Sequence, residues 1–166
     1  MILGMTKSTF TLLHVLLSLV GIGSGLIVVF GMLTGRRLNS WTAIFLSTTV
    51  LTSITGFLFP IKHLGPAHKI GVASLTLLVL AIVARYAFHL AGAWARTYVL
   101  AAMTALYLNV LIAVAQAFMK VPVLKALAPT RKDPPFLVAE SLVLALFIAL
   151  TILAAKRFRG DSIRAL

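Results

Sequence analysis

The sequence contains no cysteine and only three acidic residues among its 166. The absence of cysteine excludes disulfides, iron–sulfur clusters with cysteine ligands and catalysis by a thiol. Charged residues make up 11% of the chain, whereas a soluble domain of ordinary composition carries about 25%. Hydrophobic residues make up 61%, and the mean hydropathy is +1.08. Too little polar surface remains for a water-soluble globule, so the composition predicts a polytopic membrane protein.

Motifs that indicate the common enzyme classes are absent as well. The sequence has no nucleophile elbow, no glycine-rich phosphate loop, no H-E-x-x-H motif and no paired-carboxylate pattern. We therefore assign no catalytic residue and favour a protein that is not an enzyme. A net charge of +12 would suggest a nucleic-acid partner in a soluble protein. In a membrane protein basic residues flank the spans, so we expect the lipid bilayer as the partner and no nucleic acid.

Long apolar runs divide the chain into five predicted membrane spans. Each is close to the roughly 20 residues that a helix needs to cross the hydrocarbon core. The backbone must satisfy its own hydrogen bonds in lipid, and these runs are too long for barrel strands, so we expect α-helices. The first run is longer than the core of a signal peptide, which has about 7–15 residues, and is interpreted as a retained span. Residues 1–166 are predicted to form a single all-α transmembrane bundle, with spans at about 10–32, 41–59, 70–90, 99–119 and 136–155.

The basic and aromatic residues indicate how the chain is oriented in the membrane. Five spans place the two termini on opposite faces of the membrane. The face of the C-terminus then carries eight basic residues and the other face seven, which favours a cytoplasmic C-terminus and an N-terminus outside the inner membrane. Four aromatic residues are expected to form an interfacial belt on the C-terminal face: Trp41, Tyr86, Trp94 and Tyr98.

Small residues at four-residue spacing predict close contacts between helices. In the first span Gly21 and Gly25 form a G-x-x-x-G motif, which allows two helix backbones to approach closely. Asn109 lies in a stripe of small residues in the fourth span and is expected to form a hydrogen bond between helices. In the second span Thr48, Thr52, Thr55 and Gly56 share a face. We interpret such stripes as packing surfaces within one bundle, with a homo-oligomer contact or a polar pathway as the alternatives. The fifth span has the same spacing at three positions, Ser141, Ala145 and Ala149.

Three histidines and one glutamate are predicted to lie at one membrane face. His14 and Glu140 lie about one turn inside the first and fifth spans, and His63 and His68 lie between the second and third. Imidazole and carboxylate groups bind zinc, copper or iron, so these four residues are candidate metal ligands. Alternatively, His14 and His68 are candidate ligands of a haem b held between two helices. In that case the glycines of the first span would leave room for the macrocycle.

The same residues also have an interpretation without a ligand. Histidine is amphipathic and is compatible with the headgroup level of a membrane. Glu140 is a functional candidate because an acid inside the membrane boundary is costly, but it also lies within reach of Arg131 or Lys132. The alternatives are a bound metal or haem, proton handling, and interfacial side chains that bind nothing.

Three segments resemble small uncharacterised multi-pass inner-membrane proteins of proteobacteria. They are GFLFPIKHLGPAHKIG (residues 56–71), ARYAFHLAGAW (84–94) and LKALAPTRKDPPF (124–136). The resemblance implies a bacterial inner-membrane location and no particular activity. An early histidine in the first span, the glycines behind it and the T-S-x-x-G of the second span are similar to haem-binding, cytochrome b-like bundles. Helical histidine pairs at two depths, which those bundles carry, are missing from this sequence.

These observations predict an integral inner-membrane protein without catalytic activity, acting as an accessory or structural subunit of a membrane complex or as a homo-oligomer. The alternative is a small redox protein that binds haem b or a metal through the histidine cluster. A small transporter or channel has less support, because the spans hold few charges and no repeated pair of broken helices.

Overall fold

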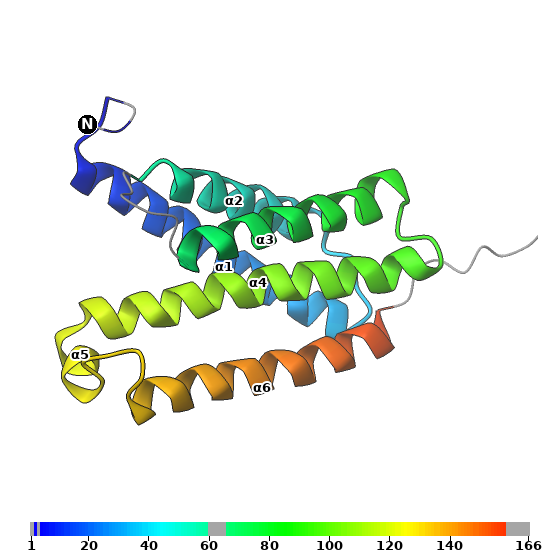
Figure 1. The fold of residues 1–166 in the computed structure, drawn as a ribbon. Helices are drawn as coiled ribbons and strands as arrows, with labels where there is room; N and C mark the ends of the chain where they lie inside the picture. Colours follow the sequence, from blue (N-terminus) through cyan, green and yellow to red (C-terminus); the bar gives the residue numbers. More distant parts are fainter. Residues whose placement is uncertain (1, 3, 60–65, 159–166) are drawn as a thin grey trace, which may run out of the picture.

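The computed structural model of the protein describes residues 2, 4–59 and 66–158. Within these residues the chain forms α-helices and one π-helical turn, and it forms no strand of a sheet. The predicted all-α bundle is therefore confirmed (Figure 1). The helices are α1 (Lys7–Leu33), α2 (Asn39–Phe57), α3 (Pro66–Ile82), α4 (Ala93–Lys120), α5 (Pro122–Leu127) and α6 (Pro134–Arg157).

Five of these helices coincide with the five predicted spans. Four segments are long and apolar enough to cross a membrane: α1, His68–Ala87, α4 and α6. The fifth helix, α2, has 19 residues, which is close to the span length, but eight of them are Ser or Thr. The chain is thus an integral membrane protein with four strongly apolar helices, and α2 is less apolar because of its hydroxyl groups.

The hydroxyl groups of α2 are compatible with lipid in part because the helix satisfies half of them itself. A Ser or Thr side chain can donate to the carbonyl oxygen four residues earlier, which removes the need for water. Four residues of α2 do so at 2.6–2.8 Å: Ser47, Thr48, Thr52 and Thr55. A polar composition therefore does not prevent α2 from packing within the bundle.

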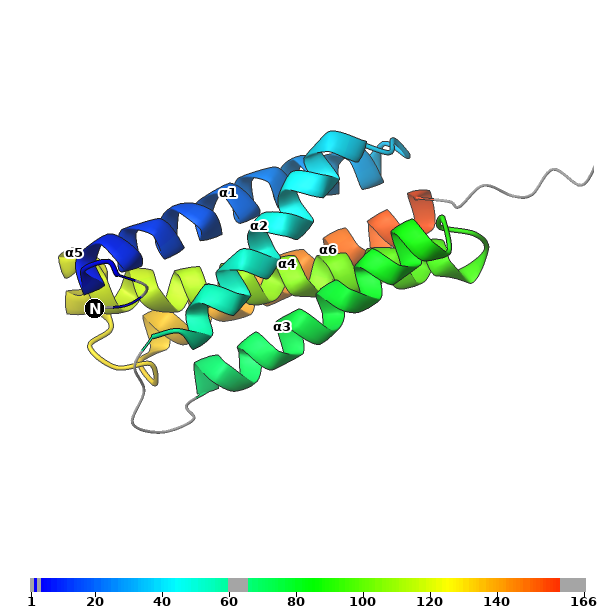
Figure 2. The same cartoon turned by 90° about the horizontal axis from the view of Figure 1, so that it is seen from above.

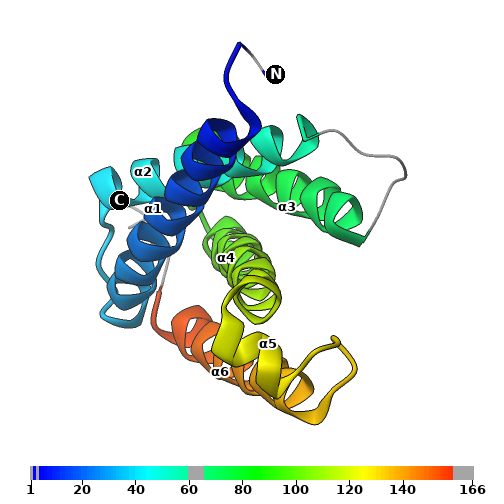
Figure 3. The ribbon, with the colours of Figure 1, turned by 90° about the vertical axis from the view of Figure 1, so that its left-hand side faces the viewer.

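Helix α4 forms the centre of the bundle. Seen along the bundle axis, it lies between α6 on one side and α1, α2 and α3 on the other (Figure 3). Helix α2 packs mainly on α1 and crosses obliquely between α1 and α3 (Figure 2). Half of the most apolar segment of α4 is buried (50%), compared with 11% of that of α6. The core is thus built around α4, and α6 covers only one side of it.

Gly21 and Gly25 lie where α1 comes close to α2 and α4. A Cβ atom at Gly25 would be 2.6 Å from Leu106 Cδ1 of α4 and 3.0 Å from the ring of Phe45 of α2. A Cβ atom at Gly21 would be 3.0 Å from Thr49 Oγ1. A larger residue at either position would push the helices apart, so the glycines permit the close approach. The space beside Gly25 is filled by the two core side chains.

A buried arginine closes the end of the bundle that lies opposite the N-terminus of α1. Arg85, in the π-helical turn Val83–Ala87, is 7% exposed and donates from Nη2 to Asn39 Oδ1 at 2.7 Å. Its guanidinium carbon lies 5.2 Å from the centroid of the Tyr98 ring, within the range of a cation–π contact. Tyr98 is 1% exposed, so the prediction that it belongs to an interfacial belt is wrong. Trp41 and Tyr86 are exposed.

The small residues of α6 do not form a packing surface. Ser141, Ala145 and Ala149 are all exposed, whereas Phe147 and Ala154, on the opposite face of the helix, belong to the core. The prediction of a packing stripe in the last span is therefore wrong. The buried face of α6 carries both a large side chain, Phe147, and a small one, Ala154, while the three small residues at four-residue spacing face outward.

We expect Gly25→Ala to destabilise the bundle, because the new methyl group would overlap Leu106 and Phe45. Overpacking of a core costs about 1–3 kcal/mol. The matched control is Gly23→Ala, where a Cβ atom would meet no described atom within 4 Å, so stability should be unchanged or slightly higher. Unfolding of the purified protein in an SDS titration measures both variants. Equal stability of the two would contradict the close approach.

Candidate functional site

A cavity of about 650 Å³ lies between the first four helices and reaches the membrane face where α1 begins. Its polar lining extends along α1 from Lys7 to Ser18 and along α4 from Lys120 to Asn109, which is 12 residues, or 11 helical steps, on each helix. At about 1.5 Å per residue this corresponds to a depth of about 16 Å. The hydrocarbon core of a bilayer is about 30 Å thick. The cavity therefore leads from one membrane face to the middle of the bundle.

Most of the cavity wall is apolar. None of the described residues that line it is acidic, whereas Lys7 and Lys120 lie at its mouth and His14 and His68 lie on its wall. The cavity therefore favours neutral or anionic groups over cations. The large apolar side chains on the wall are Val15, Leu19, Phe57, Phe59, Ile70, Leu108 and Ile112.

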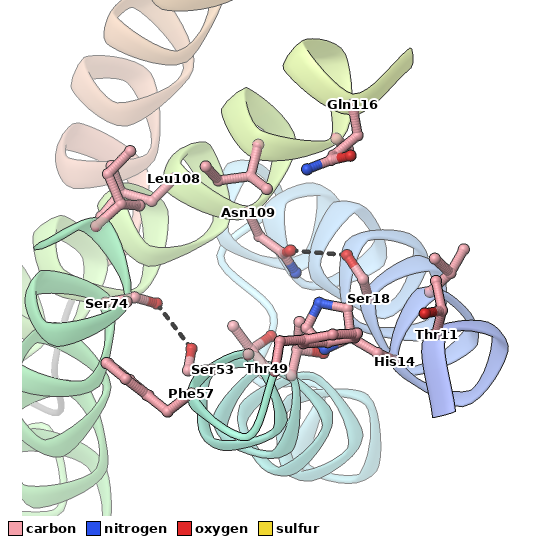
Figure 4. Close-up of a pocket in the computed structure, with 18 of the residues that line it drawn as sticks. Thr11, His14, Ser18, Thr49, Ser53, Phe57, Ser74, Leu108, Asn109 and Gln116 are labelled. Atoms are coloured by element: carbon pink, nitrogen blue, oxygen red, sulfur yellow. Dashed lines mark hydrogen bonds between the residues drawn. The ribbon is translucent and has the colours of Figure 1, made fainter. Parts of the chain in front are cut away.

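Two hydrogen bonds join the helices around the cavity (Figure 4). Ser18 Oγ of α1 donates to Asn109 Oδ1 of α4 at 2.8 Å. Ser53 Oγ of α2 donates to Ser74 Oγ of α3 at 3.3 Å. Hydrogen bonds between membrane helices typically contribute about 0.6–2 kcal/mol each. These bonds join α1 to α4 and α2 to α3, and a further bond, between His14 and Thr55, joins α1 to α2.

The hydrogen bond of His14 fixes which ring nitrogen carries its hydrogen. His14 Nδ1 lies 2.8 Å from Thr55 Oγ1. The single hydrogen of the Thr55 hydroxyl is donated to the carbonyl oxygen of Leu51 at 2.7 Å, so the threonine oxygen acts as an acceptor toward His14. The hydrogen of the neutral imidazole is therefore on Nδ1, and Nε2 keeps its lone pair. The ring also contacts the edge of Phe59, with the ring centroids 5.3 Å apart.

Three residues that line the cavity each carry a buried polar atom that has no hydrogen-bond partner in the described part of the chain. The atoms are Thr49 Oγ1, Asn109 Nδ2 and His68 Nδ1. Thr49 is 1% exposed and Asn109 is 8% exposed. A buried polar group without a partner costs about 1–3 kcal/mol, and most such groups in proteins are paired. Each of these atoms is enclosed by protein atoms, so none of them is accessible from the cavity.

The cavity ends near the middle of the bundle. Beyond Asn109, α4 presents Leu106 and Met103, which are both 1% exposed. Phe45 of α2, also 1% exposed, meets Leu106 beside Gly25. This apolar core separates the cavity from the buried arginine at the opposite end.

The structure brings together two of the four candidate metal ligands. His14 and His68 both line the cavity, whereas Glu140 of α6 does not, and His63 lies outside the described residues. Within residues 2, 4–59 and 66–158, no group of three His, Asp or Glu side chains is placed to hold a metal ion. The four-residue metal site thus stays a prediction that depends on His63.

The sequence analysis did not identify the hydroxyl residues of the cavity. The available signal was helical spacing, because the polar and small residues of α2 that line the cavity recur every three or four positions. That spacing does not distinguish a hydroxyl that bonds to its own helix from one that faces a cavity. The residues concerned are Thr11, Ser18, Thr49, Thr52, Ser53 and Ser74.

We expect Ser18→Ala to destabilise the bundle by about 1 kcal/mol, because Asn109 Oδ1 would lose its donor. The matched control is Ser47→Ala, since the exposed Ser47 hydroxyl bonds only to carbonyl oxygens of its own helix. Thermal unfolding of both variants in the same detergent compares them. An equal effect of the two substitutions would show that the bond between α1 and α4 contributes nothing.

Comparison of the chain with models of protein families, with curated proteins and with solved structures finds no match. The resemblance to proteobacterial inner-membrane proteins therefore stays a prediction. The functional argument depends on the geometry of the cavity.

Proposed function

We propose that the protein is a non-catalytic integral membrane protein that binds a small amphipathic molecule in the cavity between α1, α2, α3 and α4. One observation carries the proposal: a cavity of about 650 Å³ has a mostly apolar wall on which a few polar side chains lie, among them His14, Ser18 and Gln116. A molecule with an apolar body and a few polar groups would contact the apolar wall and pair with such side chains. Apolar walls with a few converging polar groups are typical of ligand sites, whose volumes are about 300–1,000 Å³.

The shape of the cavity favours binding over transport. A pathway through the bundle would need polar groups on both sides of the membrane centre. Phe45, Leu106 and Met103 are fully buried at that level and separate the cavity from the opposite face. We therefore prefer a binding protein to a transporter or channel.

A role as an accessory subunit is compatible with ligand binding. The outer surface of α6 exposes large apolar side chains, among them Leu142 and Leu146, which are 66% and 56% exposed. Such a surface contacts lipid or the helix of another subunit. In the orientation that the basic residues favour, the cavity would open on the outer side of a bacterial inner membrane.

Filling the cavity tests the proposal. Ala113 lines the cavity, so Ala113→Trp would occupy much of its space, and the matched control is Ala145→Trp on the exposed face of α6. Native mass spectrometry from mild detergent should show small-molecule adducts on the wild type and on the control, and no adducts on Ala113→Trp. Adducts that persist on Ala113→Trp, or that are absent from all three proteins, would contradict the proposal.

Haem b binding is the second candidate function, because His14 and His68 line the same cavity. His14 Nδ1 is bonded to Thr55, which leaves Nε2 of that ring for iron, whereas His68 Nδ1 is enclosed by protein atoms, so His68 would have to turn to bind a haem. The space beside Gly25 is filled by core side chains, so a macrocycle would have to lie nearer to the mouth.

An absorption spectrum of the purified protein, oxidised and then reduced with dithionite, separates the two candidates. Haem would give a Soret band with sharp reduced α and β bands, and these would disappear in His14→Ala and His68→Ala. An amphipathic ligand without haem would give no Soret band in any of the three proteins, which is the result we expect. A Soret band of stoichiometric intensity would replace our proposal with the haem interpretation.

A further inference from the structure

Two lysines lie at the mouth of the cavity on facing helices. Lys7 lines it from the first turn of α1, and Lys120 lines it from the last turn of α4. The hydrogen bond between Ser18 and Asn109 joins the same two helices, and each lysine lies 11 helical steps from that bond. Because α1 begins at the end of the bundle where α4 ends, equal spacing places the two lysines at the same level (Figure 1).

The described chain does not neutralise the charge of these lysines. Both side chains are exposed, and neither ammonium group forms a salt bridge or a hydrogen bond with a described residue. The acids of the described chain, Asp133 and Glu140, do not line the cavity. The mouth of the cavity therefore carries a positive charge that the anionic group of a ligand can neutralise.

An uncharged donor continues this polar region into the cavity. Gln116 lines the cavity one turn inside Lys120, and residues four apart on a helix are neighbours, with Cβ atoms about 5–6 Å apart. Figure 4 shows the Gln116 amide projecting from α4. A side-chain amide has two N–H donors, so Gln116 can donate to the anion that Lys120 attracts. The charge of Lys120 also acts on His14 of α1, two turns inside the mouth.

Deeper in the cavity the wall suits a hydrocarbon chain. Ser18 donates to Asn109 and Ser53 donates to Ser74, so these two hydroxyl hydrogens are not available to a ligand. The cavity is about 16 Å deep and is closed by core side chains at its inner end, which leaves room for the length of one chain rather than for a polar body. The apolar side chains of α1 and α4 that line it are Val15, Leu19, Leu108 and Ile112.

We propose that the ligand is a single-chain anionic lipid. Its carboxylate or phosphate headgroup lies at the mouth beside Lys7 and Lys120, and its hydrocarbon chain follows the apolar wall toward the middle of the bundle. The charge stays at the membrane face, where flexible lysine side chains and water stabilise it, and only the chain enters the hydrocarbon level. The inference rests on the proposed function, because it names the class of molecule that the same cavity binds.

Four probes with the same alkyl chain test the inference: laurate, dodecyl phosphate, dodecanol and dodecyltrimethylammonium. Native mass spectrometry of the full-length, delipidated protein in a short-chain detergent counts the probes bound at each concentration, at a pH where laurate is ionised. Every probe competes with the same detergent, so the ratios of their apparent Kd values are comparable. We expect both anions to bind about tenfold more tightly than dodecanol, and the cation to bind more weakly than dodecanol.

The double substitution Lys7→Gln/Lys120→Gln is the most informative variant. Both side chains are exposed and glutamine keeps them polar, so the fold should be retained. Laurate should then bind no more tightly than dodecanol, and dodecanol binding should be unchanged. The matched control is Lys125→Gln/Lys132→Gln, which removes two exposed lysines at the same end of the bundle that do not line the cavity. It should leave the preference for laurate unchanged.

The outcomes separate this inference from the proposed function. If dodecanol binds as tightly as the anions, or if both lysine pairs affect laurate binding equally, the anionic assignment is wrong, while adducts lost in Ala113→Trp would still support a ligand cavity. If no probe binds and Ala113→Trp changes no adduct, both proposals fail. Anion binding that the Lys7/Lys120 pair and Ala113→Trp both abolish supports the inference. Tighter binding of laurate then identifies a fatty acid, and tighter binding of dodecyl phosphate identifies a monoacyl phospholipid.

Discussion

A polar side chain in the middle of a membrane has no water to pair with, and the arrangement of α1–α4 depends on this constraint. Four of the eight hydroxyl groups of α2 meet it by donating to the carbonyl oxygen one turn earlier in their own helix. Ser18 and Asn109 meet it by bonding between α1 and α4. Thr49 Oγ1 and the amide nitrogen of Asn109 have no partner in the described chain, and both lie against Gly21 of α1. The polar atoms without a partner are thus enclosed where α1 comes close to α2 and α4.

The two halves of the bundle use small residues in opposite ways. At Gly25 the missing side chain lets Leu106 and Phe45 fill the space, and the helices form a dry core that continues toward Arg85 and Tyr98. Toward the N-terminus of α1, the small residues Gly56, Gly71 and Ala113 lie on the cavity wall, and the His14 ring lies against Gly56. A close-packed half thus provides rigidity, and an open half provides the volume for a ligand.

The sequence was sufficient to predict the helices. Apolar runs of this length with few charges cross lipid as α-helices, because a helix satisfies its own backbone hydrogen bonds. The sequence was not sufficient to predict which face of a helix points inward. Ser141, Ala145 and Ala149 have packing spacing but face outward, because α6 contacts α4 through its large residues. Tyr98 has the position of an interfacial residue but is buried beneath Arg85, a contact between segments 13 residues apart across a turn. Side-chain orientation depends on how helices rotate against one another, and the weak amphipathicity of membrane helices leaves that rotation undetermined.

The role of His14 could not be derived from the sequence, because it depends on a hydroxyl 41 residues away. A histidine at this depth, considered alone, is equally suited to donate, to accept or to bind a metal. Thr55 removes the ambiguity, since its own hydrogen is committed to the backbone and its oxygen is left only as an acceptor. The imidazole must then donate through Nδ1 and accept through Nε2. The role of His14 in the cavity is therefore determined by a contact between α1 and α2, which the spacing of residues within one span does not reveal.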